Sequence, residues 1–393
     1  MRQSRTLGSV GGRNEQSSGL PDQPFLAGYV EITPHPLGTA MTQPRAALVS
    51  LDATPWYHLV NRCVRRAFLC GTDSVSGQCY EHRRGWIADR LHQLAGVFAI
   101  DVAAYAVMNN HYHLVVRVDA LRAAEWSDDE VLRRWTALFT GPLLVQRYRA
   151  GAEQLPAERA AVTKLAATYR ERLADISWFM RVLNESIARQ ANAEDGAKGR
   201  FWEGRFKSQA LLDEAAILSA MAYVDLNPIR AGIAETPEGS AHTSVAERLA
   251  GLKPESESEP MSAGEGAAAP TAATGVPAWC DALPLSPLMP FDATAQLANA
   301  IPFGFEDYLE LVETTGRCQR EDKRGLIQER VPRLLDRLNI DPEAFIAAST
   351  TLLKRFGSAV GTPASLSACC AARQARHLRG MRMAREVFER RVA

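Results

Sequence analysis

The sequence predicts an α+β protein, in which an antiparallel sheet with helices is followed by a mainly helical C-terminal part. Two β-prone runs, 100–108 and 112–118, are separated by Asn109-Asn110, a pair that favours a turn because Asn tolerates left-handed backbone. Between residues 80 and 99, large apolar side chains recur at helical spacing. Further helices are expected at 305–314, 324–338, 342–356, 364–372 and 374–391.

The chain is long enough for two or three domains. Residues 1–47 are rich in Gly, Ser, Gln and Pro without periodicity, which indicates a flexible leader. Residues 251–277 are acidic and nearly devoid of large apolar side chains, as in a disordered linker. We therefore expect one domain at 48–250, with a helical insertion at about 119–175, and a helical C-terminal domain at 278–393.

Composition narrows the class of protein. The 393 residues include 45 basic and 45 acidic side chains, so overall charge does not indicate a partner. The seven cysteines include no CxxC pair, which fits a reducing compartment and argues against a zinc ribbon. No apolar run approaches a membrane span. We expect a soluble cytoplasmic protein with no membrane partner.

The strand that begins at His111 carries the most informative pattern. Side chains alternate between the two faces of a strand, so Tyr112, Leu114 and Val116 face the core. His111 and His113 then lie together on the opposite, more polar face. Two neutral imidazoles on one rigid strand suit a metal site. Taken alone, the pair is equally compatible with a solvated or core-satisfied role.

Basic and aromatic side chains alternate from Lys198 to Lys207. Such a mixture suits single-stranded or distorted nucleic acid, because Arg and Lys meet phosphates while rings stack on bases. The other interpretation is a strand whose rings Phe201, Trp202 and Phe206 belong to the core. Upstream, residues 121–192 are helical in composition.

A helix is expected from Asp213, a suitable N-cap, to about Leu226, before Pro228. Its core stripe consists of Ile217, Leu218, Met221 and Val224. Tyr223 and Asn227 lie on another face, where small neighbours would let the tyrosine reach into a groove. A residue before proline disfavours helical geometry, so Asn227 is expected at the helix end. The plain alternative is a tyrosine half-buried against the sheet.

Four stretches carry a family resemblance when taken in order. They are YHLVNRCVRRAF from Tyr57, NHYHLVV from Asn110, FWEGRFKS from Phe201 and MAYVDLNPIRAG from Met221. Together they resemble the HUH single-tyrosine transposases, especially the REP-associated tyrosine transposases, over about residues 48–245. Later segments, such as IPFGFEDYL from Ile301, resemble the C-terminal extension of the longer bacterial members.

The resemblance implies a ferredoxin-like HUH nuclease domain that nicks and rejoins single-stranded or hairpin DNA through a covalent 5′-phosphotyrosine. It implies Tyr223 as the nucleophile and His111, His113 and Asn227 as metal ligands, whereas Tyr105 does not match the family's nucleophile. Two His and an amide, without thiolates, favour Mg²⁺ or Mn²⁺. The chain has no Walker-type loop, and rejoining needs no nucleotide cofactor.

The expected partner is DNA that folds as imperfect palindromes, bound by a monomer or a homodimer. Expected phosphate contacts are Arg62, Arg65, Arg66, Arg117, Arg200, Arg205, Lys207 and Arg230. In the C-terminal part, Arg373, Arg376, Arg379, Arg382 and Arg385 recur every three residues and would form a basic stripe on one helix. Such a stripe suits DNA binding or a plain solvated face, and the resemblance favours DNA.

Three other functions remain open at this level. A domesticated, non-catalytic protein could regulate by binding DNA hairpins. A replication initiator or relaxase would use the same chemistry, although such proteins generally have a larger context. A His/Asn metallohydrolase would need no tyrosine.

Overall fold

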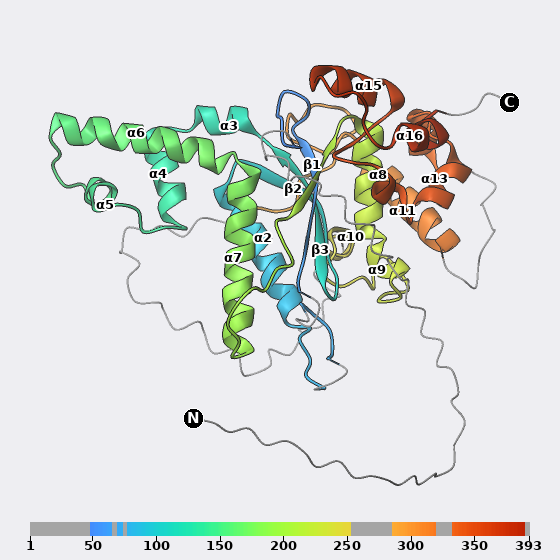
Figure 1. Cartoon of the computed structure of the whole chain (residues 1–393), viewed down its shortest axis with the longest axis horizontal. Coiled ribbons are helices and arrows are strands. Elements are labelled where there is room, and N and C mark those ends of the chain that lie inside the picture. Colours follow the sequence, from blue (N-terminus) through green and yellow to red (C-terminus); the bar gives the residue numbers. More distant parts are fainter. Residues whose placement is uncertain (1–47, 65–68, 74–76, 253–284, 320–331, 390–393) are drawn as a thin grey trace, which may run out of the picture. The chain divides into compact units, whose positions relative to one another are not determined.

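The computed structural model of the chain describes residues 48–64, 69–73, 77–252, 285–319 and 332–389 (Figure 1). The predicted leader, most of the predicted linker, and Arg65 and Arg66 lie outside the described residues. Elements that precede and follow the linker pack against one another, as the following contacts show. The predicted domain boundaries stay predictions.

One five-stranded sheet organises the fold. Its strands are β1 (Trp56–Arg62), β2 (Ile100–Val107), β3 (His111–Val118), β4 (Lys207–Leu211) and β5 (Ala359–Val360). They lie side by side in the order β2-β3-β1-β4-β5, and only the pair β4 and β5 is parallel. The predicted hairpin is confirmed, since β2 and β3 are antiparallel with Val107 opposite Tyr112. The mixed α+β character is confirmed as well.

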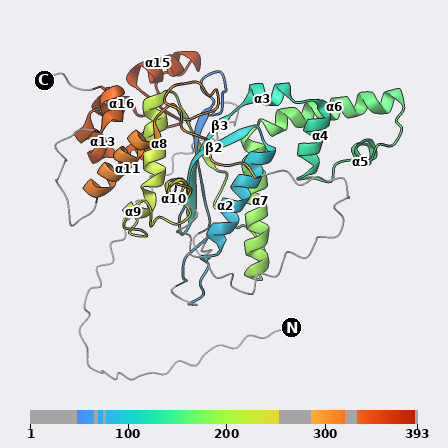
Figure 2. The ribbon, with the colours of Figure 1, turned by 180° about the vertical axis from the view of Figure 1, so that it is seen from behind.

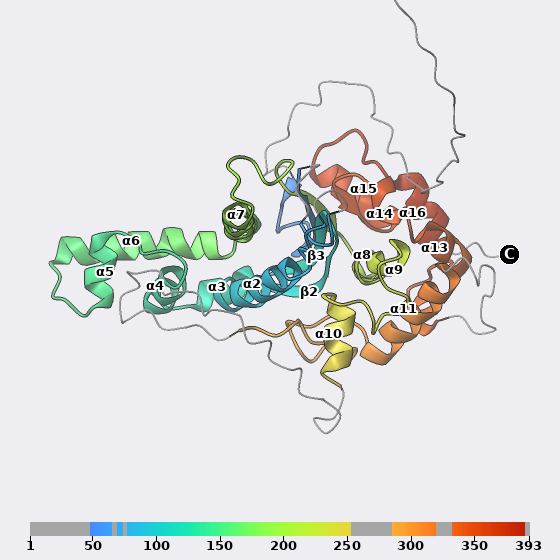
Figure 3. The same ribbon diagram turned by 90° about the horizontal axis from the view of Figure 1, so that it is seen from below.

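Two helices cover one face of the sheet, which we call the α7 face (Figure 3). They are α2 (Arg83–Val97) and α7 (Ile176–Glu194), which also pack on each other. Asn184 of α7 accepts hydrogen bonds from Asn61 on β1 and Tyr112 on β3. Between β3 and α7 the chain forms α3 (Ala120–Glu125), α4 (Asp128–Thr136), α5 (Leu143–Arg149) and α6 (Pro156–Leu173).

The opposite face, the α8 face, is covered by α8 (Glu214–Asp225). Asp213 caps this helix as predicted, accepting from the backbone N–H of Ala216. Every residue from Ala215 to Asp225 is buried, because α8 also contacts helices of the C-terminal part (Figure 2). The prediction of one core stripe and one open face was therefore wrong. After α8 come α9 (Asn227–Arg230) and α10 (Ser244–Ala250).

The described C-terminal elements pack around α8 and extend the sheet. The helices are α11 (Phe305–Gln319), α12 (Arg333–Arg337), α13 (Pro342–Ala348), α14 (Leu352–Arg355), α15 (Pro363–Ala372) and α16 (Met381–Val387). The long helix predicted at 374–391 does not form: α15 ends at Ala372, and Gly380 adopts a φ of 117° just before α16. A Cβ on Gly380 would lie 2.2 Å from the Phe356 ring. The arginines from 373 to 385 thus form no single stripe.

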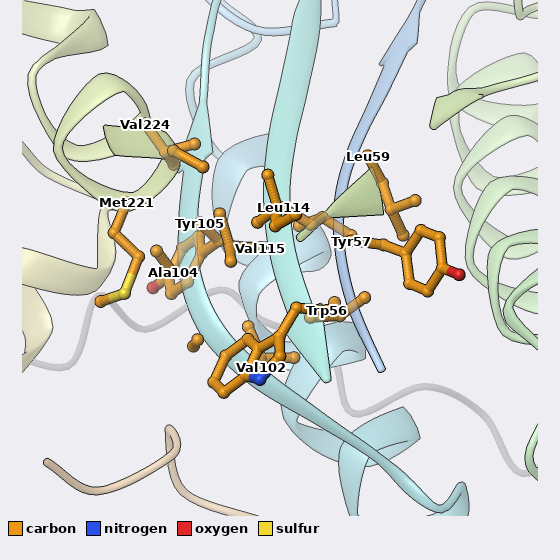
Figure 4. Close-up of a cluster of buried hydrophobic side chains, with 14 of the residues drawn as sticks. Trp56, Tyr57, Leu59, Val102, Ala104, Tyr105, Leu114, Val115, Met221 and Val224 are labelled. Carbon is orange, nitrogen blue, oxygen red and sulfur yellow. The ribbon is translucent and has the colours of Figure 1, made fainter. Parts of the chain in front are cut away.

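The core between the sheet and α8 is apolar and continuous (Figure 4). Met221 and Val224 of α8 face the sheet, where Ala104 and Val115 are also buried. This packing fixes the rotation of α8 about its axis, and so the direction in which Tyr223 points. No described helix is long and apolar enough to cross a membrane.

Candidate functional site

His111 and His113 begin β3 and share the α8 face. Tyr112 and Leu114 alternate with them and are fully buried on the α7 face, as predicted. The histidine face is not open, however, because α8 covers it and leaves His113 only 5% exposed. The two imidazole centroids are 4.9 Å apart. The pair therefore lies at the start of β3, beneath α8 and largely removed from water.

The structure brings Tyr223 to this pair. The Tyr223 ring of α8 meets the His113 ring edge-on, with centroids 5.5 Å apart. A third imidazole, His58 of β1, lies 6.1 Å from the same tyrosine ring. No role was predicted for His58. Its place in the stretch YHLVNRCVRRAF was a signal in the sequence, but its neighbours depend on strand order.

A line of hydrogen bonds runs across three strands to His113. His113 Nδ1 is 2.9 Å from His58 Nε2, and His58 Nδ1 is 2.9 Å from Gln209 Oε1 on β4. Gln209 lies directly opposite His58 in the β1–β4 ladder. The nitrogen of its carboxamide donates to the carbonyls of Leu353 and Gly357, both at 2.9 Å. His111 has a separate partner, with its Nδ1 2.7 Å from Asn110 Oδ1.

All three rings are neutral at neutral pH. Burial lowers the pKa of His58 to about 4, against a weaker opposing effect of the Gln209 hydrogen bond. Burial, with help from the charges of Arg62 and Lys354, lowers the pKa of His111 to about 4. The pKa of His113 lies well below its ordinary value, mainly through burial. A neutral imidazole keeps one nitrogen lone pair, as a metal ligand requires.

Tyr223 is buried rather than standing clear of its helix. It is 6% exposed, so the prediction that the side chain stands clear of its helix was wrong. Burial raises the pKa of its phenol, and the charge of Arg230 opposes that rise. The guanidinium of Arg230 lies 4.0 Å from the centre of the tyrosine ring and donates to the carbonyls of Tyr223 and Ser349.

A narrow crevice runs beside the tyrosine. Its walls come from α8, α9, α11 and α13, and the lining residues are Ser219, Ala222, Tyr223, Leu226, Arg230, Thr315, Phe345 and Ser349. Residues from the C-terminal part thus close over the tyrosine from one side.

Asn227 is placed less simply than the sequence predicted. The helix ends at Asp225, and Asn227 begins the next short helix, α9, in agreement with the expectation that it lies at the helix end. Its Nδ2 is buried without a hydrogen-bond partner among the described residues. Among the residues that the structure describes, no hydrogen bond joins Asn227 to His111 or His113.

The predicted phosphate contacts that lie among the described residues differ in exposure. Arg62, Arg200, Arg205 and Lys207 are exposed, and Arg62 lies opposite His111 in the β1–β3 ladder. Arg117 is held by Asn299 and Asp119, and Arg230 is half-buried against Tyr223. Lys354, for which no role was predicted, is exposed on α14, and its charge acts on both His111 and His113.

The aromatic side chains between Lys198 and Lys207 belong to the core. Phe201 is 3% exposed, and Trp202 and Phe206 are each 9% exposed. The indole of Trp202 donates to the carbonyl of Asn184 and meets the Tyr112 ring edge-on. Their burial removes these rings from any stacking on bases, whereas the basic side chains of this segment and Glu203 stay exposed.

The residues present fit a divalent ion in part. Nε2 of His111 and of His113 has no hydrogen-bond partner among the described residues, and their Nδ1 atoms are taken. No group of three or more His, Cys, Asp or Glu side chains in the described ranges could hold a metal ion. The two imidazoles are available ligands, whereas the unpaired atom of Asn227 is Nδ2 and not the carboxamide oxygen that would bind a metal, so further ligands must come from that oxygen, substrate or water.

Comparisons with known proteins give little support for assigning the chain to a family. No family model and no curated protein matches the chain. A solved structure of a REP-associated tyrosine transposase bound to a REP hairpin aligns with a TM-score of 0.29 and 14% sequence identity. The alignment covers 51% of this chain and 81% of that chain. A likeness of this size establishes neither fold nor function.

Proposed function

We propose that this chain is a metal-dependent tyrosine transposase of the HUH type, which cleaves and rejoins single-stranded or hairpin DNA. One observation carries the proposal: Tyr223 lies against His113, and His113 lies against His111. The tyrosine is 110 positions beyond His113 in the sequence, on a helix that the fold packs against the histidine strand. These three residue types at one place suit attack on a phosphodiester.

The strand order supports the ferredoxin-like part of the proposal. The succession β1, α2, β2, β3, α7, β4 is a βαββαβ unit, with α3 to α6 inserted between β3 and α7. Both helices of the unit lie on the α7 face, so the other face is left for α8 and the histidines. One face of the sheet is thus covered by α2 and α7, and the proposed chemistry belongs to the opposite face.

In the proposed reaction, the Tyr223 oxygen attacks the phosphorus of a DNA phosphodiester. A bond forms between phosphorus and the tyrosine oxygen, and the bond to the 3′ oxygen breaks. The phenolic proton is lost and the released 3′ hydroxyl gains one, so the step balances. Because the phosphotyrosine keeps the phosphodiester bond energy, a 3′ hydroxyl can reverse the step without a nucleotide cofactor.

The surroundings of Tyr223 affect this step in two ways. An unperturbed phenol has a pKa of about 10, and burial raises that of Tyr223 further. Arg230 opposes this effect, because its positive charge favours the phenolate. The same charge, with those of Arg62 and Lys354 around the histidines, would attract a DNA phosphate.

We further propose that His111 and His113 hold Mg²⁺ or Mn²⁺ through Nε2, with the carboxamide oxygen of Asn227 as third ligand. When bound, such an ion would stabilise negative charge that develops on the phosphate. Imidazole ligands without thiolates favour these ions over structural Zn²⁺.

The test is formation of a covalent protein–DNA adduct. The protein is incubated with Mn²⁺ or Mg²⁺ and end-labelled single strands that fold as hairpins, and then run on a denaturing gel. We expect a denaturant-resistant adduct with wild type, and none with Tyr223→Phe or His111→Ala. Tyr105→Phe is the matched control: its hydroxyl binds Glu247 on the other side of β2, so the adduct should persist.

An adduct formed by Tyr223→Phe would contradict the assignment of the nucleophile. Cleavage without an adduct would favour a metallohydrolase. Binding of the hairpin without cleavage, by a wild-type protein that also binds Mn²⁺, would favour a non-catalytic regulator.

A further inference from the structure

Gln209 and His58 occupy a place for which the proposed chemistry has no direct use, since neither touches Tyr223's oxygen or the expected metal position. We propose that they are positioning residues that hold neutral His113 as the Nδ1–H tautomer, which leaves Nε2 as the nitrogen available to a metal. The proposal rests on the proposed function for the role of His113. Its geometric basis is the hydrogen-bonded line from the C-terminal segment 353–357 to β3.

The orientation of the Gln209 carboxamide is fixed at its outer end. Its nitrogen donates to two backbone carbonyls, those of Leu353 and Gly357, at 2.9 Å each. Rotation of the amide by half a turn would bring its oxygen against both carbonyl oxygens and lose two hydrogen bonds. The amide oxygen must therefore face His58.

The direction of the remaining hydrogen bonds follows from this orientation. The oxygen of Gln209 only accepts, so Nδ1 of His58 carries the proton between them. A neutral imidazole has one donor and one acceptor, so Nε2 of His58 accepts. Nδ1 of His113 must then donate to it across 2.9 Å, and Nε2 of His113 keeps its lone pair.

Strand geometry holds the line in place. Gln209 is directly opposite His58, and His58 is the diagonal neighbour of His113, because Val115 is its direct partner on β3. His58 is 2% exposed, and its ring is within 7° of parallel to that of His113. Metal-bound histidines commonly donate their other ring N–H to such a partner, which fixes tautomer and orientation.

The two metal-site histidines differ in this respect. His111 Nδ1 is hydrogen-bonded to Asn110, whose carboxamide has no second hydrogen bond among the described residues to fix which end faces the ring. His113 is instead tied through Gln209 to residues that flank Lys354, whose charge acts on both rings. The C-terminal segment thus takes part in building the site as well as packing on it.

The first test needs no variant. Two-bond ¹H–¹⁵N NMR spectra of ¹⁵N-histidine-labelled, full-length protein are recorded at neutral pH with a chelator. We expect both His58 and His113 as Nδ1–H tautomers, with His113 assigned through His113→Gln. An Nε2–H tautomer at His113 in wild type would overturn the proposal.

The second test removes the anchor. In Gln209→Leu, we expect His113 to shift toward the Nε2–H tautomer and Mn²⁺ affinity, measured by calorimetry, to fall about 10- to 100-fold. Gln93→Leu, which changes an exposed glutamine of α2, is the matched control and should alter neither readout. A Gln209→Leu protein with unchanged spectrum and affinity would refute the positioning role. Wild type that shows the expected tautomers but binds no Mn²⁺ would contradict the proposed function and leave the tautomer assignment standing.

Discussion

The two faces of the sheet are equally well buried but use their polar groups differently. On the α7 face, Asn184 accepts from both Asn61 and Tyr112, and the indole of Trp202 donates to its backbone carbonyl. On the α8 face, the hydrogen bonds pass from one polar group to the next and end at His113.

The difference between the two faces shows how a buried face can keep polar groups available for a reaction. A buried polar group is tolerated when its hydrogen-bonding capacity is met within the protein. On the α7 face, Asn61, Tyr112 and Trp202 meet it through Asn184, and these residues behave as ordinary core. The α8 face leaves imidazole lone pairs without a protein partner among the described residues, and a positive charge from Arg230 beside the tyrosine.

The largest expected effect is on the α7 face. Tyr112→Ala should lower the free energy of unfolding by about 3–5 kcal/mol, because it empties a fully buried aromatic site packed against Trp202. Tyr112→Phe is the matched control. It should cost about 1 kcal/mol, since Asn184 keeps its bond from Asn61. Urea denaturation measures both, and equal losses would show that the hydroxyl, not packing, dominates this face.

Two histidines should give the protein opposite responses to pH. Burial lowers the pKa of His58 to about 4, so the unfolded chain binds the proton more readily and His58 reduces stability as pH falls below about 6.5. At pH 5.5 this amounts to roughly 1 kcal/mol. On α2, the hydrogen bond to Glu247 raises the pKa of His92, so its contribution is present at acid pH and lost as pH rises.

The check compares unfolding free energies of wild type, His58→Gln and His92→Gln at pH 5.5 and 8, with chelator present. His58→Gln should cost more at pH 8 than at pH 5.5, and His92→Gln more at pH 5.5 than at pH 8. The same pH trend in both variants would contradict the assigned environments.

The smallest effect on stability is expected from the exposed charges near the histidines. Arg62→Ala and Lys354→Ala should each change the free energy of unfolding by less than about 0.5 kcal/mol, because both side chains are exposed. Each should nevertheless reduce the salt slope of single-stranded DNA binding by about 0.7. Arg189→Ala, an exposed arginine on α7, is the control and should leave that slope unchanged. Equal slopes in all three variants would show that Arg62 and Lys354 do not contact DNA.

Local patterns were sufficient to predict several parts of the site. The Asn-Asn turn and the two β-prone runs predicted the hairpin, and strand alternation placed His111 and His113 on one face. Asp213 marked the start of the helix that carries Tyr223. Each of these features depends on residues within a few positions of one another, through backbone geometry and short-range hydrogen bonds.

Other parts depended on which distant segments meet. The sequence could not show that β1 lies between β3 and β4, and that order alone brings Gln209, His58 and His113 into one line. The burial of Tyr223 likewise required C-terminal helices to pack on the outer side of α8.

Local sequence patterns therefore sufficed for the β2–β3 hairpin, the start of α8 and the strand face shared by His111 and His113, because turns, caps and strand periodicity are local properties. Tertiary packing instead sets how α8 covers the strand face of His111 and His113. It also sets the proposed tautomer of His113 and the charge that lies over Tyr223. These depend on strand order and on packing between residues more than a hundred positions apart, such as Gln209 and Gly357.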